Sequence, residues 1–189
     1  MKKDNYIIKS LNGMAYGFFC SLIIGTIFKQ IGNFANISQL AAWGEVATYL
    51  MGPAIGAGIA YAIDAKGLNL IAAVIAGTIG AGTFNGNTAT TGNPIAAFVA
   101  VIIAVEVTRL VQGKTPVDIL LVPFTSIIVA GIVTIFIGPY ITKLIVWIGD
   151  LINQGVNMQP FFMSIVVAVL MGMALTAQIS SAAIGVMLG

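Results

Sequence analysis

Polar but uncharged side chains crowd one short stretch of an otherwise apolar sequence, residues 83–94 (TFNGNTATTGNP). Amide and hydroxyl groups donate and accept hydrogen bonds without carrying charge, which suits a neutral hydroxylated ligand such as a sugar. The candidate ligand-binding side chains are Asn85, Asn87, Thr88, Thr90, Thr91 and Asn93. Asn, Gly and Thr are also typical of a loop between two spans. The stretch is therefore either an outside loop or a re-entrant binding element.

A second polar group interrupts the apolar C-terminal part of the chain. It consists of Thr176, Gln178, Ser180 and Ser181. Polar interruptions at membrane depth persist where they face protein or a water-filled cavity, so these residues are the second half of a candidate solute site. The alternative is hydrogen bonding between packed helices, which Ser and Thr commonly provide.

Two carboxylates stand inside apolar stretches, where they are candidates for ion or proton coupling. Intramembrane carboxylates are costly to insert and are functional hypotheses by default. Glu106 has Arg109 three residues later, which favours an interfacial ion pair. Glu45 has no cationic neighbour in sequence, so an interfacial position, a proton carrier and a substrate acceptor all remain open.

Several chemistries are excluded by residue counts. The chain has no histidine and one cysteine, Cys20, so it offers no His-based triad, no histidine metal ligand and no internal disulfide. We therefore expect no catalytic residue, no metal site and no cofactor in this chain. The net charge of +2 is too small for a nucleic-acid surface.

The composition is that of an integral membrane protein. Of the 189 residues, 59% are hydrophobic and only 7% are charged, whereas soluble domains carry about 25% charged residues. Because a helix needs about 20 residues to cross a bilayer, the charge-free stretches predict about six transmembrane spans in one all-α domain covering 1–189. These spans lie near 10–28, 40–63, 68–83, 94–112, 119–142 and 160–184. The third span, next to the polar stretch, is short for a crossing.

Lysine and arginine indicate the orientation. If the N-terminus is inside, Lys2, Lys3, Lys9, Lys66, Arg109 and Lys114 are cytoplasmic, and only Lys29 and Lys143 are outside. This bias predicts a multi-pass membrane protein with its N-terminus inside.

An internal repeat relates the two parts of the chain. Thr48, Gly52 and Pro53 recur 86 residues later as Thr134, Gly138 and Pro139. Repeat 1 spans about 11–96 and repeat 2 about 97–184; since each contains three spans, the second copy is predicted to be inverted. Inverted repeats with broken or re-entrant helices are typical of transporters that hold their solute near the bilayer midplane. Three small-residue pairs predict close helix packing: Gly13/Gly17, Gly52/Gly56 and Gly82/Gly86.

Several segments resemble the membrane-embedded IIC-type subunits of the bacterial sugar phosphotransferase system. They are 11–15 (LNGMA), 91–94 (TGNP), 114–119 (KTPVDI) with Pro123, 151–153, 159–161, 171–176 (MGMALT) and 179–183 (ISSAA). The resemblance implies a short or truncated member located in the bacterial cytoplasmic (inner) membrane. It also implies a homodimer, and sugar transport coupled to phosphorylation by cytoplasmic IIA and IIB partners. Asn93 and Gln178 stand where the resemblance leads us to expect aspartate and proline.

Three functions remain open on this sequence. The first is a permease that binds a neutral, sugar-type solute between the two polar breaks and exposes it alternately to each side. The second is a non-transporting membrane sensor or regulator that binds a lipid or another apolar ligand on the same scaffold. The third is a carrier coupled to ions or protons through Glu45 or Glu106. We favour the first.

Overall fold

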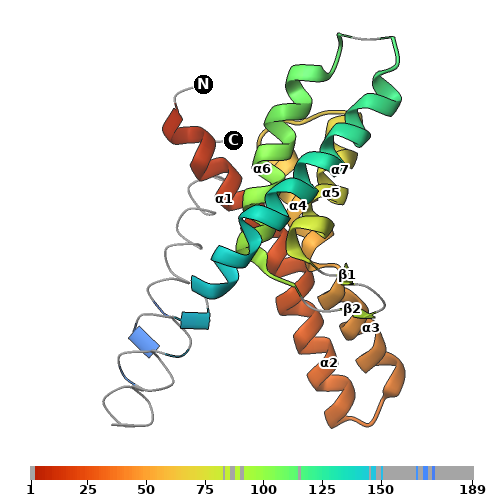
Figure 1. Ribbon diagram of the computed structural model, residues 1–189. Helices are drawn as coiled ribbons and strands as arrows, with labels where there is room; N and C mark the ends of the chain where they lie inside the picture. Colours follow the sequence, from red (N-terminus) through yellow and green to blue (C-terminus); the bar gives the residue numbers. More distant parts are fainter. Residues whose placement is uncertain are drawn as a thin grey trace.

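The computed structural model describes residues 3–144, except 83, 86–87, 90–91 and 115, together with 146, 147, 150, 165, 168, 169 and 172. The described chain is helical apart from one minimal hairpin (Figure 1). Its elements are α1 (Lys3–Phe18), the π-helical turn η1 (Phe19–Ile23), α2 (Ile24–Phe34), α3 (Ser38–Tyr49), α4 (Met51–Ala62), α5 (Leu68–Ala81), β1 (Phe84–Asn85), β2 (Thr88–Ala89), α6 (Pro94–Val111) and α7 (Asp118–Phe136).

Three helical stretches within the described residues are long and apolar enough to cross a membrane. They are Tyr6–Phe34, Pro94–Val111 and Asp118–Phe136, and α5 is a shorter apolar helix. The prediction of an all-α membrane fold is confirmed. The stretch expected as the second span, 40–63, consists of two helices, α3 and α4, separated at Leu50. The expected sixth span, 160–184, lies almost entirely outside the described residues.

Two long helical segments run antiparallel to each other along one side of the molecule. One consists of α1, η1 and α2, and the other of α3 and α4. α1 packs on α4 and α2 packs on α3. Glycines bring the two backbones together: a Cβ on Gly13 would lie 2.3 Å from the carbonyl oxygen of Gly58, and one on Gly17 would lie 2.3 Å from that of Ala54. The prediction of close packing at Gly13 and Gly17 is confirmed.

α5 is the central helix, because it packs on α4, α6 and α7. A Cβ on Gly56 would lie 2.2 Å from the oxygen of Ala73, and one on Gly77 would lie 2.3 Å from that of Gly52. The predicted packing of Gly52 and Gly56 is thus also confirmed. The largest fully buried apolar side chains lie on the helices that pack on α5, namely α4 with its C-cap residue, α6 and α7: Met51, Ile55, Ile59, Ile63, Val101, Val105 and Val122.

The third small-residue prediction is wrong at Gly82. A Cβ there would meet nothing within 4 Å, and the residue has a φ of +66°. Gly82 ends α5 in the left-handed conformation, which glycine adopts without a steric penalty. The same residue type therefore packs helices at one position and terminates a helix at another.

Two helix breaks occur beside the Gly-Pro pairs that the sequence repeats. α3 ends at Tyr49 and α4 begins at Met51, two residues before Pro53. α7 ends at Phe136, and helical residues resume at Gly138, next to Pro139. Proline lacks the N–H that an uninterrupted helix requires and its ring crowds the preceding turn, so each break has a cause in the sequence.

Candidate functional site

The polar stretch 83–94 joins α5 to α6 and is closed at its base. The N–H of Asn93 donates to the carbonyl oxygen of Ala81 at 2.8 Å. Between these two residues the chain forms a two-residue antiparallel pairing, in which Asn85 faces Thr88. The described residues of this stretch therefore form a hairpin between two antiparallel helices.

Asn93 fixes the start of α6. Its Oδ1 accepts from the N–H groups of Ile95 at 3.0 Å and Ala96 at 3.1 Å, and Pro94 occupies the first helical position. An N-cap asparagine satisfies backbone donors that have no partner inside the helix. The structure thus gives Asn93 a capping role, and its predicted role as a solute ligand stays a prediction.

The other predicted solute-binding residues are only partly covered by the structure. Asn85 lies in β1 and Thr88 in β2, where they occupy paired positions of the hairpin. The remaining predicted ligands of both polar groups lie outside the described residues: Asn87, Thr90, Thr91, Thr176, Gln178, Ser180 and Ser181.

The hairpin is reached through a short helix. α5 has 14 residues, which rise about 21 Å, less than the roughly 30 Å of a bilayer core. The other ends of α5 and α6 are joined by a buried hydrogen bond, in which Thr108 Oγ1 donates to Asn69 Oδ1 at 2.6 Å. Figure 1 shows β1 and β2 well short of the lower end of α2.

Glu106 is held by two side chains at the opposite end of α6. Its Oε1 accepts from Tyr6 Oη at 2.6 Å and from Arg109 Nη1 at 2.8 Å. The structure thus contains the Glu106–Arg109 ion pair that the sequence favoured. Arg109 also donates through Nη2 to the carbonyl oxygen of Ile63, just beyond the end of α4. The sequence did not indicate Tyr6, which is 100 residues from its partner.

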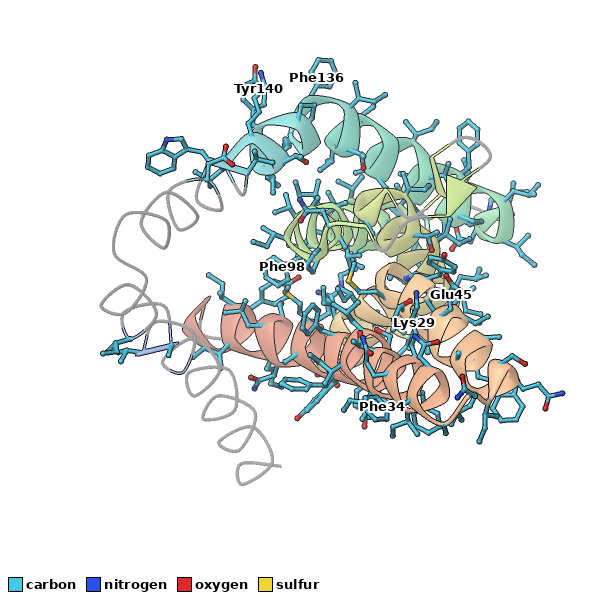
Figure 2. The ribbon with its side chains drawn as sticks, turned by 90° about the horizontal axis from the view of Figure 1, so that it is seen from below. Lys29, Phe34, Glu45, Phe98, Phe136 and Tyr140 are labelled. Carbon is cyan, nitrogen blue, oxygen red and sulfur yellow. The ribbon has the colours of Figure 1, made fainter. Side chains whose placement is uncertain are left out.

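Glu45 has partners that its sequence neighbours did not reveal. Lys29 Nζ, on α2, lies 3.4 Å from Glu45 Oε1, and Tyr49 Oη donates to the same oxygen at 2.9 Å. Figure 2 shows Lys29 and Glu45 lying next to each other. Both side chains are 43% exposed, and this geometry favours an ion pair that links α2 to α3.

Residues 8–189 match the family of proteins described as "Phosphotransferase system, EIIC". The match covers nearly the whole chain. The chain belongs to the phosphotransferase system EIIC family. No curated protein and no solved structure matches it.

EIIC proteins are the membrane subunits of sugar phosphotransferase systems and work with cytoplasmic IIA and IIB proteins. The family and the apolar helices together make this chain a multi-pass protein of the bacterial inner membrane. The family resemblance inferred from the sequence is confirmed. Within this EIIC chain, the hairpin at 83–94 connects the two apolar helices α5 and α6.

Proposed function

We propose that this EIIC chain is a permease for a neutral hydroxylated solute of the sugar type, and that segment 83–94 is a re-entrant element that binds it. The observation that carries the proposal is the closed base of the hairpin, where Asn93 N–H bonds to Ala81 O at 2.8 Å. Because α5 and α6 return the chain to the side from which it came, the polar stretch sits at the turning point.

The depth of this turning point favours a position inside the bilayer. Lys66 and Arg109 mark one membrane boundary in the proposed orientation, and α5 extends about 21 Å from there. The apolar helical stretch Tyr6–Phe34 has 29 residues and is about 43 Å long, so it extends beyond the hairpin. Polar backbone at such depth is tolerated where it is buried in protein or lines a water-filled cavity.

The second polar group, 174–181, would complete the site from the other repeat. We propose six membrane-embedded segments in two inverted copies, with α5 and α6 among them as the re-entrant pair, the N-terminus inside and the two polar breaks facing one solute near the midplane. The recurrence of a helix break beside Pro53 and beside Pro139 supports the repeat. Alternating access would then expose the site between the breaks to each side in turn.

Phosphorylation would be performed by partner proteins. The chain has no histidine, and its single cysteine, Cys20, lies in η1, within an apolar helical stretch. We therefore propose that cytoplasmic IIA and IIB proteins supply the phosphoryl group, and that two copies of this chain form a homodimer.

The test is ligand-dependent thermal stability of the detergent-purified chain with a panel of sugars and a panel of lipids. A ligand that binds only the folded protein stabilises it by about 2.7 kcal/mol at a hundredfold excess over its Kd. We expect a saturable increase in Tm with one sugar class. An increase with lipids alone would overturn the proposal in favour of a lipid-binding sensor.

Two substitutions test the binding segment itself. Asn87→Leu and Thr90→Val should each lower sugar affinity about tenfold, the cost of about one lost hydrogen bond, while leaving the folded yield close to that of the wild type. Thr142→Val is the matched control, because it removes an exposed hydroxyl outside this segment. Wild-type affinity in both segment variants would remove 83–94 from the site.

A further inference from the structure

The two antiparallel helical segments, α1–η1–α2 and α3–α4, are each interrupted, and the two interruptions lie at the same level along the pair. On one side of this level Gly17 faces Ala54, and on the other side Gly25 faces Gly44 and Thr48. Between these contacts lie η1 (Phe19–Ile23) on one helix and Leu50 on the other. The two interruptions therefore lie opposite each other across the pair.

The first interruption is a widened helical turn. The N–H of Ile24 donates to the carbonyl oxygen of Phe19, five residues earlier, instead of four. Ser21 Oγ donates to the oxygen of Gly17 at 2.6 Å, and Thr26 Oγ1 donates to that of Leu22 at 2.7 Å. Hydroxyls that bond to the preceding turn bend helices, and π-helical turns are a common cause of kinks.

The second interruption follows from Pro53. The proline cannot donate to the carbonyl of Tyr49, and its ring crowds that group. Leu50 has ψ near +9°, outside the helical range, and joins α3 to α4 without a side-chain cap. The connection from α1 to α2 through η1 therefore has an irregular hydrogen-bond pattern, and the connection from α3 to α4 at Leu50 lacks one helical hydrogen bond.

The segments on either side of this level are tightly packed. The arm, residues 24–49, has α2 against α3 at backbone contact: a Cβ on Gly32 would lie 2.3 Å from the nitrogen of Ala41. The Lys29–Glu45 ion pair also joins its two helices. The body, α1 with α4 to α7, is joined by the glycine contacts and by the bonds of Arg109 and Glu106.

Within the part of the chain that the structure describes, the arm makes few contacts with the body. Among the described residues, α2 and α3 pack extensively only on each other and on η1, and neither makes an extensive contact with α5, α6 or α7. Figure 1 shows the two helices projecting together at the lower right, beyond the α5–α6 hairpin. A rigid arm joined to a rigid body through two weakened turns has the construction of a hinge.

We propose that η1 and Leu50 form a hinge about which residues 24–49 move as one unit relative to the body. The 11 residues of α2 make a lever of about 16 Å, so a 20° change at the hinge displaces the tip by about 6 Å. The movement follows from the helices alone and does not depend on which solute the protein carries.

Distances between pairs of spin labels, measured by pulsed EPR in lipid nanodiscs, test the hinge. In a Cys20→Ser background, labels at Asn33 and Lys66, both exposed, report arm against body. Labels at Lys66 and Ile95 report the body alone. We expect a broad or two-peaked distribution for the first pair and a narrow one for the second.

Pro53→Ala restores a backbone N–H donor at position 53. It should narrow the distance distribution between the labels at Asn33 and Lys66, and leave the distribution between Lys66 and Ile95 unchanged. Pro123→Ala, within α7, is the matched control and should alter neither distribution. If Pro53→Ala does not fold, Ser21→Ala provides the second test, because loss of its bond to Gly17 should shift the arm–body distance alone.

Three results would overturn the hinge. The first is a wild-type arm–body distribution as narrow as that of the body pair. The second is an arm–body distribution that neither Pro53→Ala nor Ser21→Ala changes. The third is an equal narrowing by Pro123→Ala, which would place the motion elsewhere.

Discussion

The crossing of α1 and α4 offers the sharpest test of the packing. A Cβ added to Gly58 would lie 2.1 Å from the carbonyl oxygen of Gly13, whereas ordinary contact begins at 3.4 Å. The substitution Gly58→Ala therefore forces the two backbones apart by about 1.3 Å. Overpacking costs about 1–3 kcal/mol, and alanine returns up to about 1 kcal/mol of helix propensity. Because a backbone oxygen cannot rotate away from the added methyl group, we expect the upper end of the overpacking cost. The free energy of unfolding should therefore fall by about 2 kcal/mol in total.

Gly131→Ala is the matched control for this substitution. Gly131 lies in α7, where an added Cβ would meet nothing within 4 Å, so only the propensity gain of about 1 kcal/mol applies. At about 2–4 °C per kcal/mol for a chain of this size, Gly58→Ala should lower Tm by about 4–8 °C and Gly131→Ala should raise it slightly. The assay is the loss of the monodisperse gel-filtration peak after heating in detergent. A Gly58→Ala protein as stable as Gly131→Ala would refute the close crossing.

Three further sets of substitutions test individual polar contacts by the same thermal assay. Asn93→Ala should destabilise the protein by about 1 kcal/mol through loss of the N-cap, whereas Asn93→Asp should retain wild-type Tm because a carboxylate also caps and complements the helix dipole; equal losses would refute the cap. Thr108→Val should lower the free energy of unfolding by about 1–3 kcal/mol, because it leaves the buried amide oxygen of Asn69 without this donor. The double variant Asn69→Leu/Thr108→Val should lose less than the sum of the two single variants, and strict additivity would contradict the hydrogen bond. Glu45→Gln should lower the free energy of unfolding by less than about 1 kcal/mol, because the ion pair of Glu45 with Lys29 is half exposed. A larger loss of stability, found at high as well as low salt, would mean that Glu45 has a role beyond this pair.

The elements that the sequence predicted best are those with a local signal. The charge-free runs located the apolar helices, and the crowding of Asn and Thr at 83–94 located the turn between α5 and α6. Small residues at Gly13, Gly17, Gly52 and Gly56 predicted close packing because the absence of a side chain is itself the signal. Gly82 shows the limit of this signal, since a helix-ending glycine and a packing glycine look identical in sequence.

Contacts between distant residues could not be predicted from one sequence. Tyr6 and Glu106 are 100 residues apart, and Lys29 reaches Glu45 only because the turn after α2 brings α3 back along it. The positions next to Glu45 in the sequence therefore do not reveal its cationic partner, which is 16 residues away. The division of 40–63 into two helices could be predicted in principle, because Pro53 lies inside that stretch.

The polar contacts explain which helices pack on each other in a chain whose helices are all similarly hydrophobic. In a bilayer the lipid is as apolar as the side chains, so burial alone does not select one helix face over another. The faces turned toward α5 carry hydroxyls that bond to the chain opposite: Thr108 to Asn69, and Ser126 to the carbonyl oxygen of Ala72 at 3.0 Å. The outer face of α7 carries large exposed side chains such as Ile135 and Phe136. We infer that small residues and hydroxyls, rather than apolar periodicity, determine the packing of the helices and hence the position of the hairpin at 83–94.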